Sequence, residues 1–177
     1  GDVYKRQDFK DSTVKLIDVI EAVNGIEGIE RIRLGSLEPL IVTEEFVRRL
    51  AKCKKICPHF HLSLQSGCDE TLKRMNRRYN VDEYYKGVEL LREYFPDAAV
   101  TTDVIVGFPG ETEEEFNITK KYLEKVCFYE MHVFKYSRRK GTAADKMPDQ
   151  IPESIKSERS TELLEPVSYT HLTLPTI

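Results

Sequence analysis

The sequence lacks any apolar run long enough to cross a bilayer, and it shows no signal-peptide pattern. It has only four cysteines in 177 residues, so reduced thiols are expected and a disulfide-rich secreted domain is excluded. An excess of basic residues is also missing: the formal net charge is −3, and any contact with nucleic acid must therefore be local. These absences predict a cytoplasmic protein with no membrane partner.

The cysteines form no recognisable cluster motif. Cys53 and Cys57 have the spacing C-x-x-x-C, but no third cysteine follows within the next several residues. An iron–sulfur cluster needs three or four thiolates that converge on one point. We therefore interpret these two thiols as structural, and Cys68 and Cys127 as packing residues.

The histidines also give no ligand pattern. His59, His61 and His132 have no carboxylate partner at the spacing of a zinc site, so we predict no metal site. His61 and His132 can still point into the interior of the fold.

The two ends of the chain differ from the rest. DVYKRQ at 2–7 and VSYTHLTLPT at 167–176 resemble translated adapters of sequencing libraries, and neither continues the pattern of its neighbour. Such scars do not belong in fold reasoning. We therefore expect residues 1–7 and 167–177 to be artefacts, and residues 8–166 to be part of one natural domain.

The most informative stretch is TTDVIVGFPGETEEEF at 101–116. β-Branched residues dominate its first half, which predicts a buried strand that ends at Gly107. Thr112 with Glu115 has the spacing of a capping box and predicts the start of a helix. A strand, a glycine loop and a helix start form the place where α/β folds bind ligands, although a plain βα connection gives the same pattern.

Strand and helix patterns alternate along the whole chain. Apolar residues at helical spacing, capping residues and strand alternation predict helices at 14–23, 43–53, 69–75, 81–94 and 113–126, a final helix after Pro152, and strands at 29–37, 59–67, 100–106 and 128–137. Four strands separated by helices favour a parallel sheet. The polar alternate positions of these strands favour a barrel-like interior that holds a ligand.

Two loops are locally basic. One contains Lys73, Arg74, Arg77 and Arg78, and the other is the run 138–140. The basic residues of each loop are either solvated surface groups without a partner or groups that contact RNA phosphates.

Four segments together resemble one family. They are RIRLGSLEP at 31–39, HLSLQSGCDETLKRMNRRY at 61–79, TTDVIVGFPGETEEEF at 101–116 and HVFKYSRRKGTAADKMPDQIP at 132–152. Together they resemble the radical S-adenosylmethionine (SAM) methylthiotransferases. The first and last resemble most closely the branch that acts on N6-threonylcarbamoyladenosine beside the tRNA anticodon.

The resemblance implies an α/β fold, a partial (β/α) TIM-type barrel with about four of six parallel strands present. It implies SAM and two 4Fe–4S clusters in the parent protein, tRNA as substrate, and an electron donor that the sequence does not identify. The cluster-binding C-x-x-x-C-x-x-C loop of the family is absent from this chain. We therefore expect the chain to be inactive alone.

The resemblance also implies site residues at the carboxyl ends of the strands. The expected cofactor-binding residues are Gln65, Ser66, Asp103, Ile105, Gly107, Phe134 and Tyr136. The expected RNA-binding residues are Arg77, Arg78, Arg138, Arg139 and Lys140. Two alternatives stay open: the same chemistry on a ribosomal protein, and a non-catalytic nucleotide- or RNA-binding α/β module.

Overall fold

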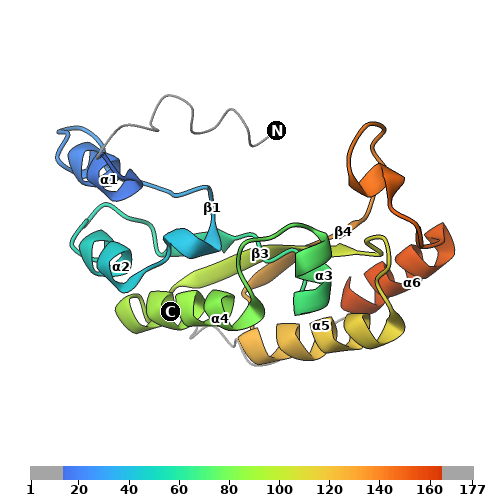
Figure 1. Ribbon diagram of the computed structural model, residues 1–177. Helices are drawn as coiled ribbons and strands as arrows, with labels where there is room; N and C mark the ends of the chain where they lie inside the picture. Colours follow the sequence, from blue (N-terminus) through green and yellow to red (C-terminus); the bar gives the residue numbers. More distant parts are fainter. Residues whose placement is uncertain (1–13, 165–177) are drawn as a thin grey trace.

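Residues 14–164 are described by the computed structural model, whose strands form one parallel sheet in the order β1-β2-β3-β4 (Figure 1). The strands are β1 Ser36–Leu37, β2 His59–Leu62, β3 Ala99–Val106 and β4 Glu130–Lys135. The helices are α1 Leu16–Asn24, α2 Glu44–Leu50, α3 Asp69–Arg74, α4 Val81–Tyr94, α5 Glu113–Val126 and α6 Glu153–Leu164. Short 3-10 turns lie at η3 Pro39–Ile41 and η4 Ala144–Lys146. The expected parallel α/β architecture is confirmed, whereas the expected artefacts at 1–7 and 167–177 lie outside the described residues.

Helices line one face of the sheet. Figure 1 shows α4, α5 and α6 side by side along this face, with α3 above them. Strand residues that point toward these helices, such as Phe60, Leu62 and Val104, are completely buried. Burying a side chain of this size contributes about 1.5–3 kcal/mol, so this layer is the main source of stability.

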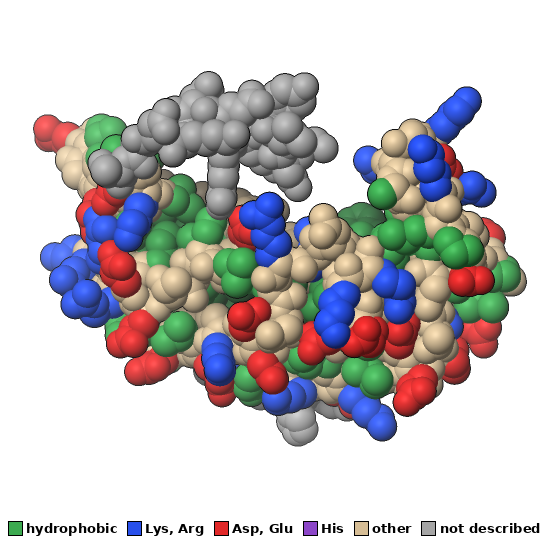
Figure 2. Space-filling model, viewed as in Figure 1, with side chains coloured by type: hydrophobic (Ala, Val, Ile, Leu, Met, Phe, Trp, Pro, Cys, Tyr) green, Lys and Arg blue, Asp and Glu red, His purple; other side chains and the backbone are tan. Residues whose placement is uncertain are grey.

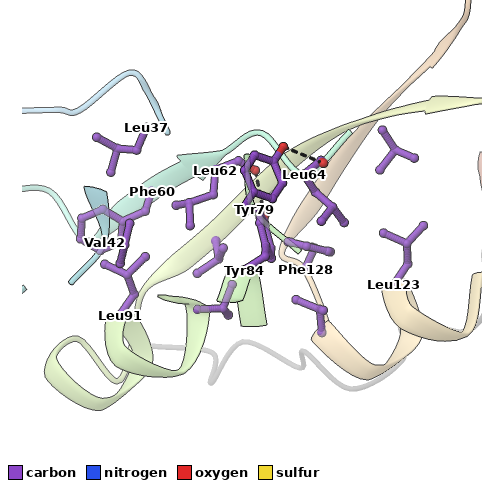
Figure 3. Packing of buried hydrophobic residues seen from close by; sticks show 14 of the residues in the cluster. Leu37, Val42, Phe60, Leu62, Leu64, Tyr79, Tyr84, Leu91, Leu123 and Phe128 are labelled. Atoms are coloured by element: carbon purple, nitrogen blue, oxygen red, sulfur yellow. Dashed lines mark hydrogen bonds between the residues drawn. The ribbon is translucent and has the colours of Figure 1, made fainter. Parts of the chain in front are cut away.

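Two tyrosines tie the helix layer to the strands. The Tyr84 hydroxyl donates to the Leu62 carbonyl oxygen at 2.8 Å, and the Tyr79 hydroxyl donates to the Leu64 carbonyl oxygen at 3.0 Å (Figure 3). Both rings lie among apolar side chains, and this burial raises the pKa of Tyr79 to about 12. A buried hydroxyl must find an acceptor, so these bonds fix how the helices sit on the sheet.

The capping patterns predicted the limits of two helices correctly, whereas the helices expected at 14–23 and 43–53 span 16–24 and 44–50. Helices α4 and α5 have the predicted bounds. Their capping boxes are formed by Asn80 with Glu83 and by Thr112 with Glu115. Each box satisfies two backbone groups that the first helical turn leaves unpaired.

Several expectations were wrong in detail. The strand predicted at 59–67 ends at Leu62. The strand predicted at 29–37 contains only β1 and an isolated bridge between Ile32 and Ile56, because the chain between them leaves the ladder. The strand predicted at 128–137 is shorter and spans 130–135. Cys127, expected in the packing, is exposed and has a φ of 54° at the end of α5. Its left-handed backbone turns the chain out of the helix there.

Candidate functional site

The sheet face opposite α4, α5 and α6, called the open face below, carries a row of polar side chains. His61 pairs with Thr101 in the ladder, and Asp103 pairs with His132. Strand side chains alternate between the two faces, so these four lie opposite the apolar layer. The polar alternation in the sequence therefore marks a surface that the described helices leave uncovered.

At the carboxyl end of β3 lies the glycine loop, residues 107–111. Gly107 has a φ of +71°, and its amide donates to Glu111 Oε1 at 2.9 Å. A Cβ at this position would lie 2.3 Å from Lys156 Cγ. Glycine is therefore required twice here, by the backbone conformation and by the close approach of α6.

A buried ion pair holds the glycine loop against α6. Arg159 Nη1 lies 2.7 Å from Glu111 Oε1 and also donates to the Glu111 carbonyl oxygen at 3.2 Å. The two residues are only 5% and 4% exposed. Burial raises the pKa of Glu111, although the Gly107 amide and Arg159 both favour the ionised carboxylate. The loop is thus anchored by a charge pair that water does not screen.

Most of the expected cofactor-binding residues lie together along the second half of β3 and beside it. The Gln65 amide donates to the Asp103 carbonyl oxygen, and the Ile105 amide donates to the Gln65 carbonyl oxygen, both at 2.8 Å. Ile105 pairs with Phe134, whose ring is 53% exposed. Gln65 has a left-handed backbone conformation, with a φ of 72°, which the local sequence did not predict. These residues form a continuous shelf at the carboxyl ends of β2, β3 and β4.

Tyr136 completes this shelf. Its amide donates to the Val106 carbonyl oxygen at 2.9 Å, and its ring packs edge-on against Phe108 with centroids 5.2 Å apart. The buried Tyr136 hydroxyl has no hydrogen-bond partner among the described residues. A buried polar atom without a partner is typical of a ligand site, so the shelf fits a polar cofactor.

Ser66 does not join the shelf. It is 1% exposed, its hydroxyl lies 3.2 Å from Thr119 Oγ1 on α5, and it accepts from the Cys68 amide at 3.2 Å. The hydroxyl therefore has two partners within the chain. Its expected contact with a cofactor stays a prediction.

The two basic loops are largely exposed, although Arg74 of the first is half-buried and paired with Glu115. Arg77 and Arg78 follow α3, and 138–140 follow β4. Figure 2 shows blue side chains on the loop that projects beyond β4. Arg138 is paired with Asp145 at 2.6 Å, so its charge is partly compensated. Both loops remain accessible to a large anionic partner.

A histidine cluster, missed by the sequence reasoning, lies on the open face. It comprises His61, Asp103 and His132, whose ligand atoms all lie within 4.8 Å of one another. The carboxylate ligand is not close to either histidine in the sequence, because Asp103 lies on β3, between the strands that carry His61 and His132. The alternation of side chains along each strand could have predicted the histidine cluster, because all three residues occupy open-face positions of adjacent parallel strands.

A cavity of about 410 Å³ adjoins the histidine cluster. Its walls include Arg33, His59 and Glu130 as well as two members of the cluster. His59 Nδ1 is buried without a partner among the described residues, and its Nε2 lies 3.4 Å from Arg33 Nη2. Burial, followed by the charge of Arg33, lowers the pKa of His59, so the ring is neutral near pH 7.

The cysteines do not form a cluster site. Cys53 and Cys68 are buried, Cys57 is half-buried and Cys127 is exposed. Within 14–164 the histidine cluster alone brings three potential metal ligands together. A 4Fe–4S cluster needs three or four converging thiolates, and the thiols of the described chain do not form such a group.

Comparison with known sequences gives a consistent result. Residues 5–123 match the Radical SAM superfamily. The chain is 46% identical over 159 residues to tRNA-2-methylthio-N(6)-dimethylallyladenosine synthase of Acetivibrio thermocellus, covering 90% of this chain and 33% of that protein. It is 41% identical over 156 residues to threonylcarbamoyladenosine tRNA methylthiotransferase of Thermotoga maritima, covering 88% of this chain and 36% of that protein. The chain spans about a third of the length of these curated relatives.

Solved structures support the fold. Coproporphyrinogen III oxidase from Escherichia coli, described as a radical SAM enzyme, superposes with a TM-score of 0.62 at 20% identity, over 76% of this chain and 31% of that one. The cobalamin-dependent radical enzyme OxsB gives a TM-score of 0.53 at 13% identity, over 84% of this chain and 19% of that one. The partial barrel predicted from the sequence is thereby confirmed. None of the helices within 14–164 is long and apolar enough to span a membrane.

Proposed function

Because the chain belongs to the radical SAM superfamily, we propose that it is part of the catalytic domain of an enzyme that methylthiolates C2 of an adenosine in tRNA. The observation that carries this proposal is the similarity of about nine-tenths of the chain to relatives named for that reaction. Because the chain spans about a third of those relatives, the activity is proposed for the whole protein.

Membership of the superfamily implies SAM and a 4Fe–4S cluster as cofactors. SAM supplies a radical that takes hydrogen from a carbon that no side-chain acid or base can activate. We place it on the shelf near the glycine loop. Gly107 allows a close backbone approach, and the exposed Phe134 ring offers an apolar surface to the adenine. The unpartnered hydroxyl of Tyr136 supports a polar contact at the same shelf.

The other expected contacts in this proposal are polar. The Gln65 side chain hydrogen-bonds the ribose or the methionine portion of SAM, and Asp103 hydrogen-bonds a hydroxyl or an amine. The backbone at Ile105 lies close to the cofactor. The alternation along β3 supports the last two roles, because Asp103 and Ile105 both occupy the open face. Ser66 would need a second hydrogen bond in addition to its contacts with Thr119 and Cys68.

We infer that the intact enzyme carries two 4Fe–4S clusters and that this polypeptide alone is inactive. The inference about activity rests on the thiols present here, which do not converge on one point within the described residues. The radical reaction begins with an electron from an iron–sulfur cluster, so a chain that cannot bind this cluster cannot start the reaction.

We propose N6-threonylcarbamoyladenosine as the nucleoside that is modified. The support is the resemblance of RIRLGSLEP at 31–39 and of the segment 132–152 to that branch, together with the relative from Thermotoga maritima. The relative from Acetivibrio thermocellus, at 46% identity, favours N6-dimethylallyladenosine as a second candidate. Both candidates share the reacting C2 position and differ in the group on N6.

The two basic loops are proposed to hold the tRNA. Arg77 and Arg78 form one contact, and Arg138, Arg139 and Lys140 form the other. Their exposure supports this role, and the net charge of −3 means that attraction to phosphates must come from such local groups. A tRNA substrate supports the proposal of a cytoplasmic location.

Nucleoside mass spectrometry of tRNA from a strain lacking the encoding gene tests the proposal. We expect the 2-methylthio derivative of N6-threonylcarbamoyladenosine to disappear and its unmethylthiolated precursor to accumulate. Loss of the dimethylallyl derivative instead would select the second candidate. Unchanged tRNA with loss of a methylthio group from a ribosomal protein would overturn the proposal, as would no change in either fraction.

A further inference from the structure

We propose that His61, Asp103 and His132 form a binding site for one divalent transition-metal ion, with zinc as the reference ion. Each residue comes from a different neighbouring strand, respectively β2, β3 and β4. The site is distinct from the cofactors considered above, because it uses imidazole and carboxylate groups and no thiol. Its assignment does not depend on the proposed reaction.

The distances suit one shared ion. His61 Nε2 lies 3.2 Å from Asp103 Oδ2, and the two imidazole rings have centroids 6.0 Å apart. Bonds from zinc to nitrogen or oxygen measure about 2.0–2.2 Å, so neighbouring ligand atoms lie roughly 3–3.5 Å apart around it. The first pair already meets this spacing. Since the ligand atoms all lie within 4.8 Å, a small rotation of the exposed His132 completes the site.

The donor set is selective. Two histidines and one carboxylate on one side of an ion leave the remaining positions open, an arrangement used for zinc and for other divalent transition metals. Alkaline-earth ions prefer sites made of oxygen atoms alone. The adjoining cavity of about 410 Å³ gives water access to the open positions.

A neighbouring hydroxyl orients one ligand. His61 Nδ1 lies 3.0 Å from Thr101 Oγ1, which leaves Nε2 directed at Asp103. Such a contact fixes the ring and is common beside metal-bound histidines. The charges near the site also permit a cation, since Asp103 is negative and the cavity walls carry both Arg33 and Glu130.

The site lies on the open face, away from the glycine loop along β3. Asp103 precedes Gly107 by four residues, a separation of roughly 13 Å along an extended strand. A metal ion there would join three strands at a distance from the glycine loop. It takes one carboxylate oxygen of Asp103 and leaves the other for the cofactor contact proposed above.

The test is a zinc titration of the full chain, freed of metal by a chelator, in competition with a chromophoric indicator. We expect one zinc ion per chain and a higher melting temperature when zinc is bound. His132→Ala and Asp103→Asn should each weaken binding at least about tenfold to a hundredfold, the loss found even for residues that only support a ligand. The matched control is His59→Ala, which removes a histidine from the same cavity and should retain the affinity of the parent chain.

Two further measurements keep the test decisive. Circular dichroism establishes that each variant is folded, and His132 is exposed, so its removal opens no cavity in the core. X-ray absorption of the zinc-loaded chain should report nitrogen and oxygen ligands. Sulfur ligands would overturn the proposal, as would a chain that binds no zinc or equal affinity in all three variants and the parent.

Discussion

Replacement of Arg159 by methionine should destabilise the chain strongly through the glycine loop. The substitution keeps much of the apolar stem but leaves the carboxylate of Glu111, 4% exposed, without its cation. Removing one partner of a buried ion pair costs about 3–5 kcal/mol. The contact between Arg159 and Glu113 adds little, because the Glu113 side chain is 71% exposed. A loss of this size is a large fraction of the 5–15 kcal/mol that typically stabilises a domain.

The loss should depend on pH. Burial already raises the pKa of Glu111 in the folded chain, and removal of Arg159 raises it further. A carboxyl group with a raised folded-state pKa binds its proton more tightly in the folded chain than in the unfolded one. It therefore favours folding below the unfolded pKa near 4.5, and this contribution is lost as pH rises through the folded pKa. The defect of Arg159→Met should accordingly be largest near pH 7 and shrink toward pH 4.5.

Urea unfolding followed by far-ultraviolet circular dichroism measures both effects. The matched control is the double variant Glu111→Gln with Arg159→Met, which removes both charges and keeps an acceptor for the Gly107 amide. It should recover most of the stability lost in the single variant. The reasoning is refuted if Arg159→Met costs less than about 1 kcal/mol at pH 7, the range of exposed ion pairs. Equal losses in the single and double variants would refute it as well.

Three further substitutions test local features by the same unfolding assay. Gly107→Ala should cost about 1–3 kcal/mol, because its φ of +71° and the approach of Lys156 to 2.3 Å oppose a Cβ, whereas Gly35→Ala, with open space around it, should be tolerated. Thr112→Ala removes the cap of α5 and should cost about 1 kcal/mol; a stability equal to the parent would contradict the capping box. Tyr84→Phe should cost about 0.5–1.5 kcal/mol, the net value of one hydrogen bond, because the Leu62 carbonyl oxygen keeps Thr102 Oγ1 as a donor, and a loss well above this range would contradict the account.

Local chemistry in the sequence accounts for much of the fold. The capping boxes predicted α4 and α5 to the residue, because Asn80 and Thr112 satisfy backbone groups close to them in the chain. Strand alternation predicted β3 to within one residue and the start of β2, although the strand expected at 59–67 ends at Leu62. The strand expected at 29–37 was wrong, since only Ser36–Leu37 pairs continuously with β2 and no local signal marks where an outer strand leaves its ladder.

The candidate site was less accessible to sequence reasoning. Asp103, Ile105 and Phe134 were assigned from strand parity and the resemblance, and the structure places them together on the open face. The histidine cluster was missed, because its carboxylate comes from another strand and depends on the register between strands. The pairing of Glu111 with Arg159 joins the glycine loop to the final helix, a contact between segments far apart in the sequence that no local pattern encodes.

The most direct test uses the intact protein encoded by the source gene, with its clusters reconstituted, incubated with SAM, a reductant and tRNA from the deletion strain. The account predicts release of 5′-deoxyadenosine together with new 2-methylthio-N6-threonylcarbamoyladenosine in the tRNA. SAM left uncleaved and tRNA left unmodified by the reconstituted protein would contradict it.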